Sequence, residues 1–270
     1  MTLAAGIDAG MAPRDFHRRW PTLQPPLRPA TEVVRQMAAL LEPCSDPLLL
    51  MGVTPELATL PRTILAIDWS PAMIELAWPG DTNQRRAIEG DWKVMPLADA
   101  EVSGAMGDAV LTMLDWPRDA QMVLGELWRV VRPGGRIVLR CLATPEQPET
   151  MDGLRAALDA DGMAFHEWRL RVNMAAAHAD GTISISSDRL WQWHERCWAD
   201  REALAQRHGW PAGALDEIHA YRGSAYLHSY PTRSAIMDLI HTDWPGSGRF
   251  VETSGYAGAA LCPLLVLERS

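Results

Sequence analysis

The chain has 270 residues, a hydrophobic fraction of 47% and a formal net charge of −9 at pH 7. This length suits one large α/β domain, or a domain with an insertion, and the composition permits a sizeable core. No apolar run approaches the roughly 20 residues of a membrane span, so we predict no membrane protein. No basic segment precedes an apolar stretch near the start of the chain, so we predict no secretory signal. Nucleic-acid-binding proteins are usually basic, so the negative charge disfavours DNA and RNA as partners.

The cysteines and the single lysine exclude several kinds of chemistry. The four cysteines lie far apart, with no CxxC pair and no histidine at metal-ligand spacing, which predicts reduced thiols, no metal site and a cytoplasmic protein. Lys93 is the only lysine. The chain therefore has neither a Walker A phosphate loop nor a Tyr-x-x-x-Lys pair for hydride chemistry.

Residues 1–46 are predicted to form an N-terminal helical cap segment. Its first helix, Arg14–Trp20, is followed by a proline-rich break over residues 21–29. Thr31 then caps a second helix, because the apolar residues between positions 33 and 41 share one helical face.

From residue 47 onward, short apolar runs alternate with helical stretches. Strands are predicted at Leu48–Met51, Thr63–Ile67, Arg86–Glu89, Val102–Met106, Val110–Leu114 and Arg136–Leu142. Helices are predicted from Pro55, over Ala72–Trp78 after the N-cap Ser70, and over Ala120–Val131, with a tight turn at Pro133–Gly135. Strands and helices at this spacing predict βαβ units and therefore an α/β fold with a doubly wound, mostly parallel sheet.

The pattern becomes helical over residues 144–225, where only Thr182–Ser186 has strand character. The alternation then returns, with a helix over Pro231–Ile240 and strands at Arg249–Thr253 and Ala259–Leu267. We therefore predict that residues 47–143 and 226–270 form the sheet domain. Residues 144–225 would be a helical insertion that acts as a lid over the substrate.

The predicted strand ends carry the distinctive residues, and ligands of open parallel sheets bind at those ends. The first strand ends at Gly52, Val53 and Thr54, where glycine permits close backbone approach and a helix N-terminus offers free N–H groups. The second ends at Asp68, which can accept hydrogen bonds from a ribose diol. Alternatively, Asp68 only complements the dipole of the helix that Ser70 caps.

The next two strand ends extend the same edge of the sheet. Asp91 and Trp92 place a carboxylate beside a large ring, which suits an adenine, although a surface turn with a buried tryptophan would look the same. Gly107 and Asp108 offer a carbonyl and a carboxylate that can hold an ammonium group. The strand ends thus predict one ligand site along this edge.

This arrangement resembles the class I S-adenosylmethionine-dependent methyltransferases, whose sheet is Rossmann-like. Two segments carry most of the resemblance: Ile64–Met73, where Ser-Pro-Ala-Met follows the acidic strand end, and Leu127–Leu139, where Arg-Pro-Gly-Gly precedes an apolar strand. The resemblance covers residues 47–142 well and 226–270 loosely. It implies an enzyme with S-adenosylmethionine as cofactor, bound by Gly52, Val53, Thr54, Asp68, Trp69, Met73, Asp91, Trp92, Gly107 and Asp108.

Within that resemblance, Asp68 would bind the ribose, Asp91 and Trp92 would lie near the adenine, and Gly107 would lie near the methionine end. The first loop of the family usually reads acid-x-Gly-x-Gly-x-Gly. Here Leu50 stands at the position of the acid, and Thr54 and Glu56 replace the last two glycines. The missing acid would weaken the hold on the methionine ammonium, and the bulkier loop would narrow the approach to the cofactor.

Methyl transfer is an in-line displacement, to which an enzyme contributes alignment and exclusion of water. A general base is needed only when the nucleophile carries a proton that it cannot lose alone. Each candidate base in this chain is also explained by a surface or packing role. The candidates are His17, His166, His194, Tyr221, Arg222, Tyr226 and Tyr230.

We therefore predict a cytoplasmic methyltransferase that acts on a small-molecule substrate, without nucleic-acid or membrane partners; the sequence leaves a homodimer open. One alternative is a non-catalytic binding or regulatory subunit, which the altered loop favours. A second is an enzyme that uses the same cofactor for cyclisation or elimination. A nicotinamide dehydrogenase fits less well, because the chain lacks Gly-x-Gly-x-x-Gly.

Overall fold

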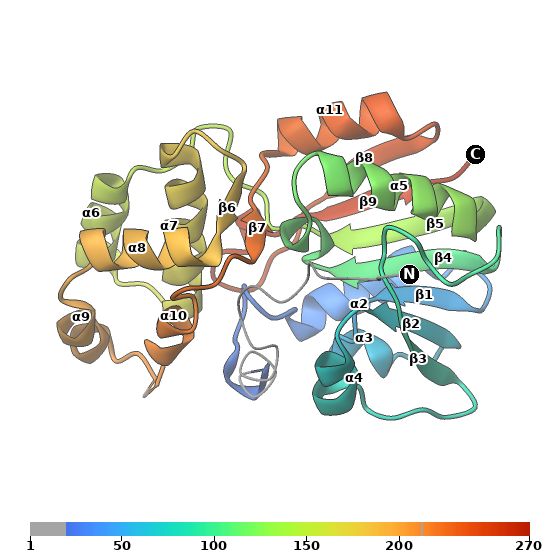
Figure 1. Ribbon diagram of the computed structural model, residues 1–270, viewed down its shortest axis with the longest axis horizontal. Coiled ribbons are helices and arrows are strands. Elements are labelled where there is room, and N and C mark those ends of the chain that lie inside the picture. The colour runs from blue at the N-terminus through green and yellow to red at the C-terminus, as the bar shows by residue number, and fades with distance from the viewer. Residues whose placement is uncertain (1–19, 212) are drawn as a thin grey trace, which may run out of the picture.

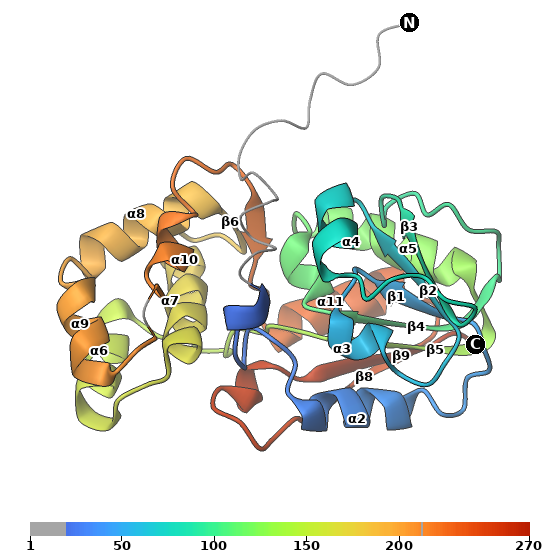
Figure 2. The same ribbon diagram turned by 90° about the horizontal axis from the view of Figure 1, so that it is seen from below.

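The computed structural model describes residues 20–211 and 213–270, and two groups of elements lie side by side in it (Figure 1). One group is a large sheet with helices, and the other is the helical group α6–α10. The predicted helix Arg14–Trp20 lies outside the described residues except for Trp20, which begins the 3₁₀ turn Trp20–Thr22. Figure 2 shows this blue start of the described chain between the two groups.

The large sheet is mostly parallel, as predicted. Its strands, in spatial order, are β3 (Arg85–Glu89), β2 (Ile64–Asp68), β1 (Leu48–Met51), β4 (Val102–Asp108), β5 (Val131–Arg140), β9 (Leu264–Glu268) and β8 (Ser247–Val251). Those from β3 to β5 run parallel, and β9 and β8 are antiparallel to their neighbours. The strand order reverses between β1 and β4, so the switch point of the sheet lies at the carboxyl ends of these two strands.

Helices cover both faces of the sheet, which explains why β1 is apolar at every position. Leu49 and Met51 pack in a core with α5 (Arg118–Val130) and α11 (Arg233–Asp243). Leu48 and Leu50 point the other way, into a second core. The helices of that second face are α2 (Thr31–Leu40), α3 (Pro55–Ala58) and α4 (Pro71–Ala77).

The second group has a core of its own. Its elements are α6 (Met151–Asp161), α7 (Phe165–Ala179), β6 (Ser184–Ser186), α8 (Ser187–Cys197), α9 (Arg201–His208), α10 (Asp216–His219) and β7 (Leu227–Ser229). Trp168 lies at the centre, with ring centroids 5.2 Å from Trp198 and 4.7 Å from Trp210. These tryptophans therefore pack against one another rather than against the sheet.

Four local predictions were wrong. Val110–Leu114 is not a strand: Ala109 turns the chain with a φ of 52°, and Val110–Met113 is a 3₁₀ helix buried beside the sheet. Pro133–Gly135 is not a turn but part of β5, because the Gly134 N–H and the Gly135 carbonyl pair with Arg269.

The strand predicted at Ala259–Leu267 begins only at Leu264, after the 3₁₀ turn Ala259–Leu261. Pro263 separates the two segments and has no N–H to donate to a sheet. At the N-terminal side, Ala30 rather than Thr31 is the N-cap of α2. In the described part of the chain, no helix is both long and apolar enough to span a membrane.

Candidate functional site

A cavity lies at the carboxyl ends of β1, β2 and β4, where the two groups of elements meet. The sheet side contributes Met51, Gly52, Val53, Thr54, Asp68, Met73, Trp92, Asp108, Ala109, Thr112, Met113 and Leu142. The helical group contributes a polar wall of Arg169, Asn173, Tyr221, His228 and Tyr230. Trp20, Leu23 and Leu27 close the cavity from the start of the described chain.

Gly52 has a φ of 88°, which only glycine adopts readily. A Cβ atom at this position would lie 3.7 Å from the Trp92 ring and 3.8 Å from Asp68 Oδ2. The glycine is therefore required by its backbone conformation, not by a steric clash. It brings the loop backbone next to the Asp68 carboxylate.

The residues that depart from the usual glycine loop do not fill the cavity. Leu50 is fully buried in the core under α2 and α3. Glu56 forms an ion pair with Arg28, and neither residue lines the cavity. Thr54 is the N-cap of α3 and does line the cavity, but its side chain makes no capping hydrogen bond.

Asp68 is 6% exposed, and within the described part of the chain only one of its oxygens accepts a hydrogen bond. Oδ1 accepts a hydrogen bond from the Ser70 N–H at 2.9 Å, and Ser70 Oγ in turn accepts from the Met73 N–H at 3.3 Å. Among the described residues, Oδ2 has no hydrogen-bond donor and faces Gly52. Burial raises the pKa of Asp68 to about 6, although the Ser70 N–H acts in the opposite direction.

The residues predicted near the adenine lie in a second cleft, which adjoins the cavity. Asp91 and Trp69 line this cleft of about 840 Å³, and Trp69 is 44% exposed. Trp92 and Met113 line both spaces, so the cavity and the cleft are neighbours. The Trp92 indole is held between them, because its Nε1 donates to the Ile67 carbonyl at 2.7 Å.

At the end of β4, Gly107 does not line the cavity, but Asp108 does. A Cβ atom on Gly107 would approach Val110 Cγ2 to 2.4 Å, so packing alone requires this glycine. Asp108 Oδ1 accepts a hydrogen bond of 2.5 Å from Nε of Arg140, which is fully buried. The positive charge of Arg140 compensates the negative charge that Asp108 would offer to an ammonium group. Sequence reasoning missed Arg140 because it stands in an otherwise apolar strand.

Two of the candidate bases lie in the polar wall of the cavity, namely Tyr221 and Tyr230. Tyr226 lines the neighbouring cleft, and its hydroxyl group donates to the Met113 carbonyl at 3.5 Å. His166 contacts the Glu217 carboxylate at 3.3 Å, and His194 contacts Asn173 Oδ1 at 3.2 Å.

The remaining candidates are Arg222 and His17. Arg222 is exposed and lies over the Trp191 ring, 5.1 Å from its centroid. His17 lies outside the described residues.

Sequence reasoning missed two of the polar residues that the helical group adds to the cavity, Asn173 and His228. Arg169 is buried, forms an ion pair with Glu217 and donates to the Tyr221 hydroxyl at 3.1 Å. Asn173 Nδ2 donates to the Tyr230 hydroxyl at 3.1 Å. His228 is 7% exposed. No motif surrounds these residues, since only the tertiary structure brings them together.

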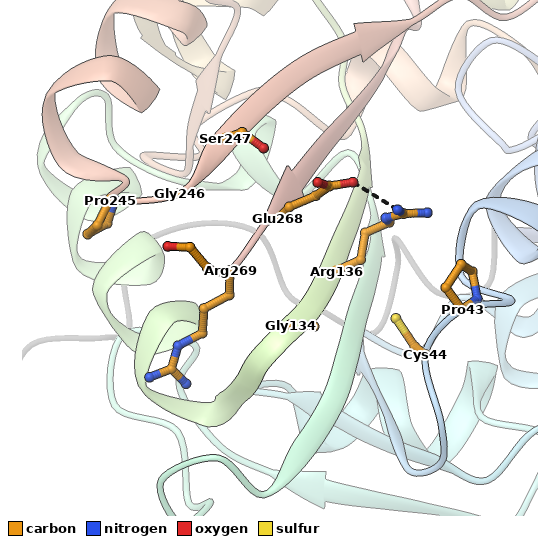
Figure 3. A pocket seen from close by; sticks show the side chains of 11 residues that line it. Pro43, Cys44, Gly134, Arg136, Pro245, Gly246, Ser247, Glu268 and Arg269 are labelled. Carbon is orange, nitrogen blue, oxygen red and sulfur yellow. Dashed lines mark hydrogen bonds and ion pairs between the residues drawn. The ribbon is translucent and has the colours of Figure 1, made fainter.

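A further pocket of about 320 Å³ lies at the opposite end of the sheet (Figure 3). Arg136 and Glu268 point toward each other in it and form an ion pair of 2.8 Å. The pocket lies at the amino-terminal end of the β5 segment that pairs with β4, whereas ligands of parallel sheets bind at carboxyl ends. We therefore assign the functional site to the first cavity.

Comparisons with known proteins find similarity to methyltransferases. A family model described as a methyltransferase domain matches residues 52–139. A malonyl-[acyl-carrier protein] O-methyltransferase of Pseudescherichia vulneris is 26% identical over 183 residues, which are 67% of this chain and 66% of that protein. The enzyme of the same description from Serratia marcescens is 33% identical over 95 residues, or 34% of each chain. The chain thus matches at most about two thirds of the length of these relatives.

Solved structures show the same fold at low sequence identity. An S-adenosylmethionine-dependent methyltransferase candidate from Methanococcus maripaludis has a TM-score of 0.51 and 11% identity, covering 100% of this chain and 97% of that one. A candidate Zn-dependent alcohol dehydrogenase from Rhodobacter sphaeroides has a TM-score of 0.58 and 11% identity, with 94% of both chains covered. At such identities the similarity concerns the fold alone, and the described residues contain no cluster of His, Cys, Asp or Glu that could hold a metal ion. Residues 52–139 thus match a methyltransferase domain, and the mostly parallel sheet agrees with that match.

Proposed function

We propose that this protein transfers a methyl group from S-adenosylmethionine to an oxygen atom of a small molecule. The observation that carries the proposal is the cavity itself. On one side it has the Gly52 turn and the buried Asp68 carboxylate, and on the other it has a polar wall from the helical group. A cofactor and an acceptor held on opposite sides of one cavity would be aligned for direct transfer.

The residues of the sheet side fit the cofactor. Asp68 Oδ2 lies beside the open backbone of Gly52 and has no donor among residues 20–211 and 213–270, and a ribose diol needs such an acceptor. In this proposal Asp68 holds the ribose, and Asp91 and Trp69 surround the adenine in the cleft that Trp92 joins to the cavity. When bound, the cofactor supplies a methyl group on a positively charged sulfur atom.

The helical group would bind the acceptor and exclude water. Residues 144–225 would act as the lid, together with Leu23 and Leu27 from the N-terminal side. Exclusion of water matters because water would otherwise compete with the acceptor and screen the charges of the site. The O-methyltransferase description of the two curated relatives supports oxygen as the methylated atom.

The four cysteines are unpaired, as expected for a protein of the cytoplasm.

A second candidate is a binding or regulatory subunit without catalysis. The observation in its favour is Leu50, which stands at the usual acidic position and is fully buried. Cofactor binding without turnover of any acceptor would support this candidate. Release of 5′-methylthioadenosine would instead indicate cyclisation or elimination.

Calorimetric titration of the full chain with S-adenosylmethionine and S-adenosylhomocysteine tests the proposal. We expect micromolar binding that Asp68→Ala abolishes. Glu75→Ala is the matched control, because it removes an exposed carboxylate of α4 and should leave binding unchanged. No binding at millimolar ligand would refute the proposed function.

A further inference from the structure

One polar side chain of the cavity has no part in cofactor binding. His228 lies on β7, whose pairing with β6 places it opposite Ile185. Figure 1 shows β7 between the helical group and the large sheet. His228 is buried and lines the same cavity as Gly52 and Asp68.

Ser187 fixes the proton of the His228 ring. Ser187 Oγ lies 3.0 Å from His228 Nε2 and 3.2 Å from the Tyr226 carbonyl, which can only accept. A hydroxyl group has one proton, so both contacts are hydrogen bonds only if Ser187 donates to the carbonyl and His228 Nε2–H donates to Ser187. The other ring nitrogen, Nδ1, is then unprotonated, and no donor to it is found among the described residues.

The groups around His228 keep the ring neutral. Tyr221, Tyr226 and Tyr230 contribute rings whose centroids lie 5.7, 5.2 and 6.5 Å from that of His228. Burial, and after it the charge of Arg169, lower the pKa of His228 to about 4. The carboxylate of Asp68 lines the same cavity.

The charges of the cavity also limit the kind of acceptor. Among the described residues that line it, Arg169 is the only permanent cation, and the buried Glu217 carboxylate compensates its charge. The lining carboxylates are Asp68 and Asp108. The lining side chains therefore offer an anionic acceptor no uncompensated positive charge, and the sulfonium of the bound cofactor would have to supply it.

We propose that His228 is the general base of this site and that the acceptor is an uncharged alcohol or phenol. This inference rests on the proposed function. In the step, a lone pair of the acceptor oxygen forms the new O–CH₃ bond as the S–CH₃ bond breaks and its electrons return to sulfur. The acceptor proton moves to His228 Nδ1. The products are the methyl ether, neutral S-adenosylhomocysteine and an imidazolium ion, which releases its proton to water.

The tautomer of His228 tests the proposal independently of turnover. Long-range proton–nitrogen NMR spectra of the full chain with ¹⁵N-labelled histidine distinguish a protonated ring nitrogen from an unprotonated one, and His228→Gln assigns the signals. We expect a neutral ring with Nε2–H and free Nδ1 from about pH 5.5 to about pH 8. A proton on Nδ1 throughout this range would overturn the proposal.

Turnover with matched acceptors gives the second test. At about pH 8 phenol keeps its proton, as a tyrosine side chain does, whereas 4-nitrophenol has lost most of its protons. We expect His228→Gln to lower the rate of phenol methylation about 100-fold and the rate with 4-nitrophenol only about threefold. His178→Gln is the control, since His178 contacts the Tyr230 carbonyl but does not line the cavity.

The other outcomes separate the two proposals. Three results would each overturn the assignment of His228 and its acceptor class. They are equal losses of rate with both phenols, methylation of benzoate alone, and no methylation of either phenol by a protein that binds the cofactor. Failure to bind S-adenosylhomocysteine would instead refute the proposed function. Calorimetry on the same samples decides between these cases and shows whether His228→Gln is folded.

Discussion

Replacing Asp68 with asparagine should stabilise the free protein at neutral pH while it abolishes cofactor binding. The asparagine Oδ1 can still accept the hydrogen bond from the Ser70 N–H, so the start of α4 keeps its partner. What the change removes is the negative charge in a buried site. If Asp68 serves only the start of the helix, the same replacement should instead be neutral or destabilising.

The size of the effect follows from the pKa of Asp68, which burial raises from 3.8 to about 6. Each unit by which the pKa of Asp68 differs between the folded and unfolded states is worth about 1.4 kcal/mol. The ionised carboxylate therefore costs the folded state about 3 kcal/mol. Below about pH 4 Asp68 is protonated in both the folded and the unfolded state, so its burial costs no stability there. The stability of the wild type therefore falls as pH rises through about 6, and that of Asp68→Asn does not.

Urea denaturation of wild type and Asp68→Asn at about pH 4 and about pH 8 measures this difference. We expect similar free energies of unfolding at the lower pH and a gain of about 3 kcal/mol for Asp68→Asn at the higher pH. Glu75→Gln, at an exposed position of the same helix, should show no such pH dependence. A loss of stability for Asp68→Asn at about pH 8 would refute the reasoning, because Asp68 would then stabilise the free protein.

Two further predictions concern the packing behind the cavity. Arg140→Ala should lower the free energy of unfolding by about 3–5 kcal/mol, because it leaves the Asp108 carboxylate buried without its partner; urea denaturation measures this loss. Gly107→Ala should cost about 1–3 kcal/mol, because the new Cβ atom would overlap Val110. The double variant with Val110→Ala should recover part of that loss, and additive losses in thermal denaturation would contradict the assigned clash.

The sheet could be predicted because its signals are local. Short apolar runs such as Leu48–Met51 end at a glycine or a carboxylate, and Ser70 and Thr232 cap the helices that follow with their side chains. Val110–Leu114 misled the prediction, since a short apolar run does not distinguish a strand from a buried 3₁₀ helix. The left-handed conformation of Ala109, which the sequence does not reveal, decides that case.

The cavity wall could not be predicted in the same way. Asp68 stands at the end of a recognisable strand, whereas His228 and Arg169 are separated by 59 positions and belong to different elements. Their meeting depends on the pairing of β6 with β7, which has only three residues in each strand. The sequence therefore indicated the strand ends that line the cavity, whereas of the polar wall it gave only Tyr221 and Tyr230, among several candidate bases.

Leu50 decides whether the altered glycine loop can be restored by one substitution. The family usually has an acid at this position, yet here the Leu50 side chain packs in the core with Leu57, Met106 and Val138 and lines neither the cavity nor the cleft. Leu50→Asp would place an unpaired carboxylate there, so we expect a loss of about 3–5 kcal/mol in the free energy of unfolding and no tighter cofactor binding.

Leu50→Met is the control, because a side chain of similar volume should cost less than about 1.5 kcal/mol. Calorimetry with S-adenosylhomocysteine on the folded fraction tests affinity, and urea denaturation tests stability. If Leu50→Asp folded well and bound the cofactor about tenfold more tightly, the carboxylate would have to reach the ligand from the core side of β1. The cofactor site would then extend beyond the cavity that Gly52 and Asp68 line, and the altered loop would be what limits cofactor binding.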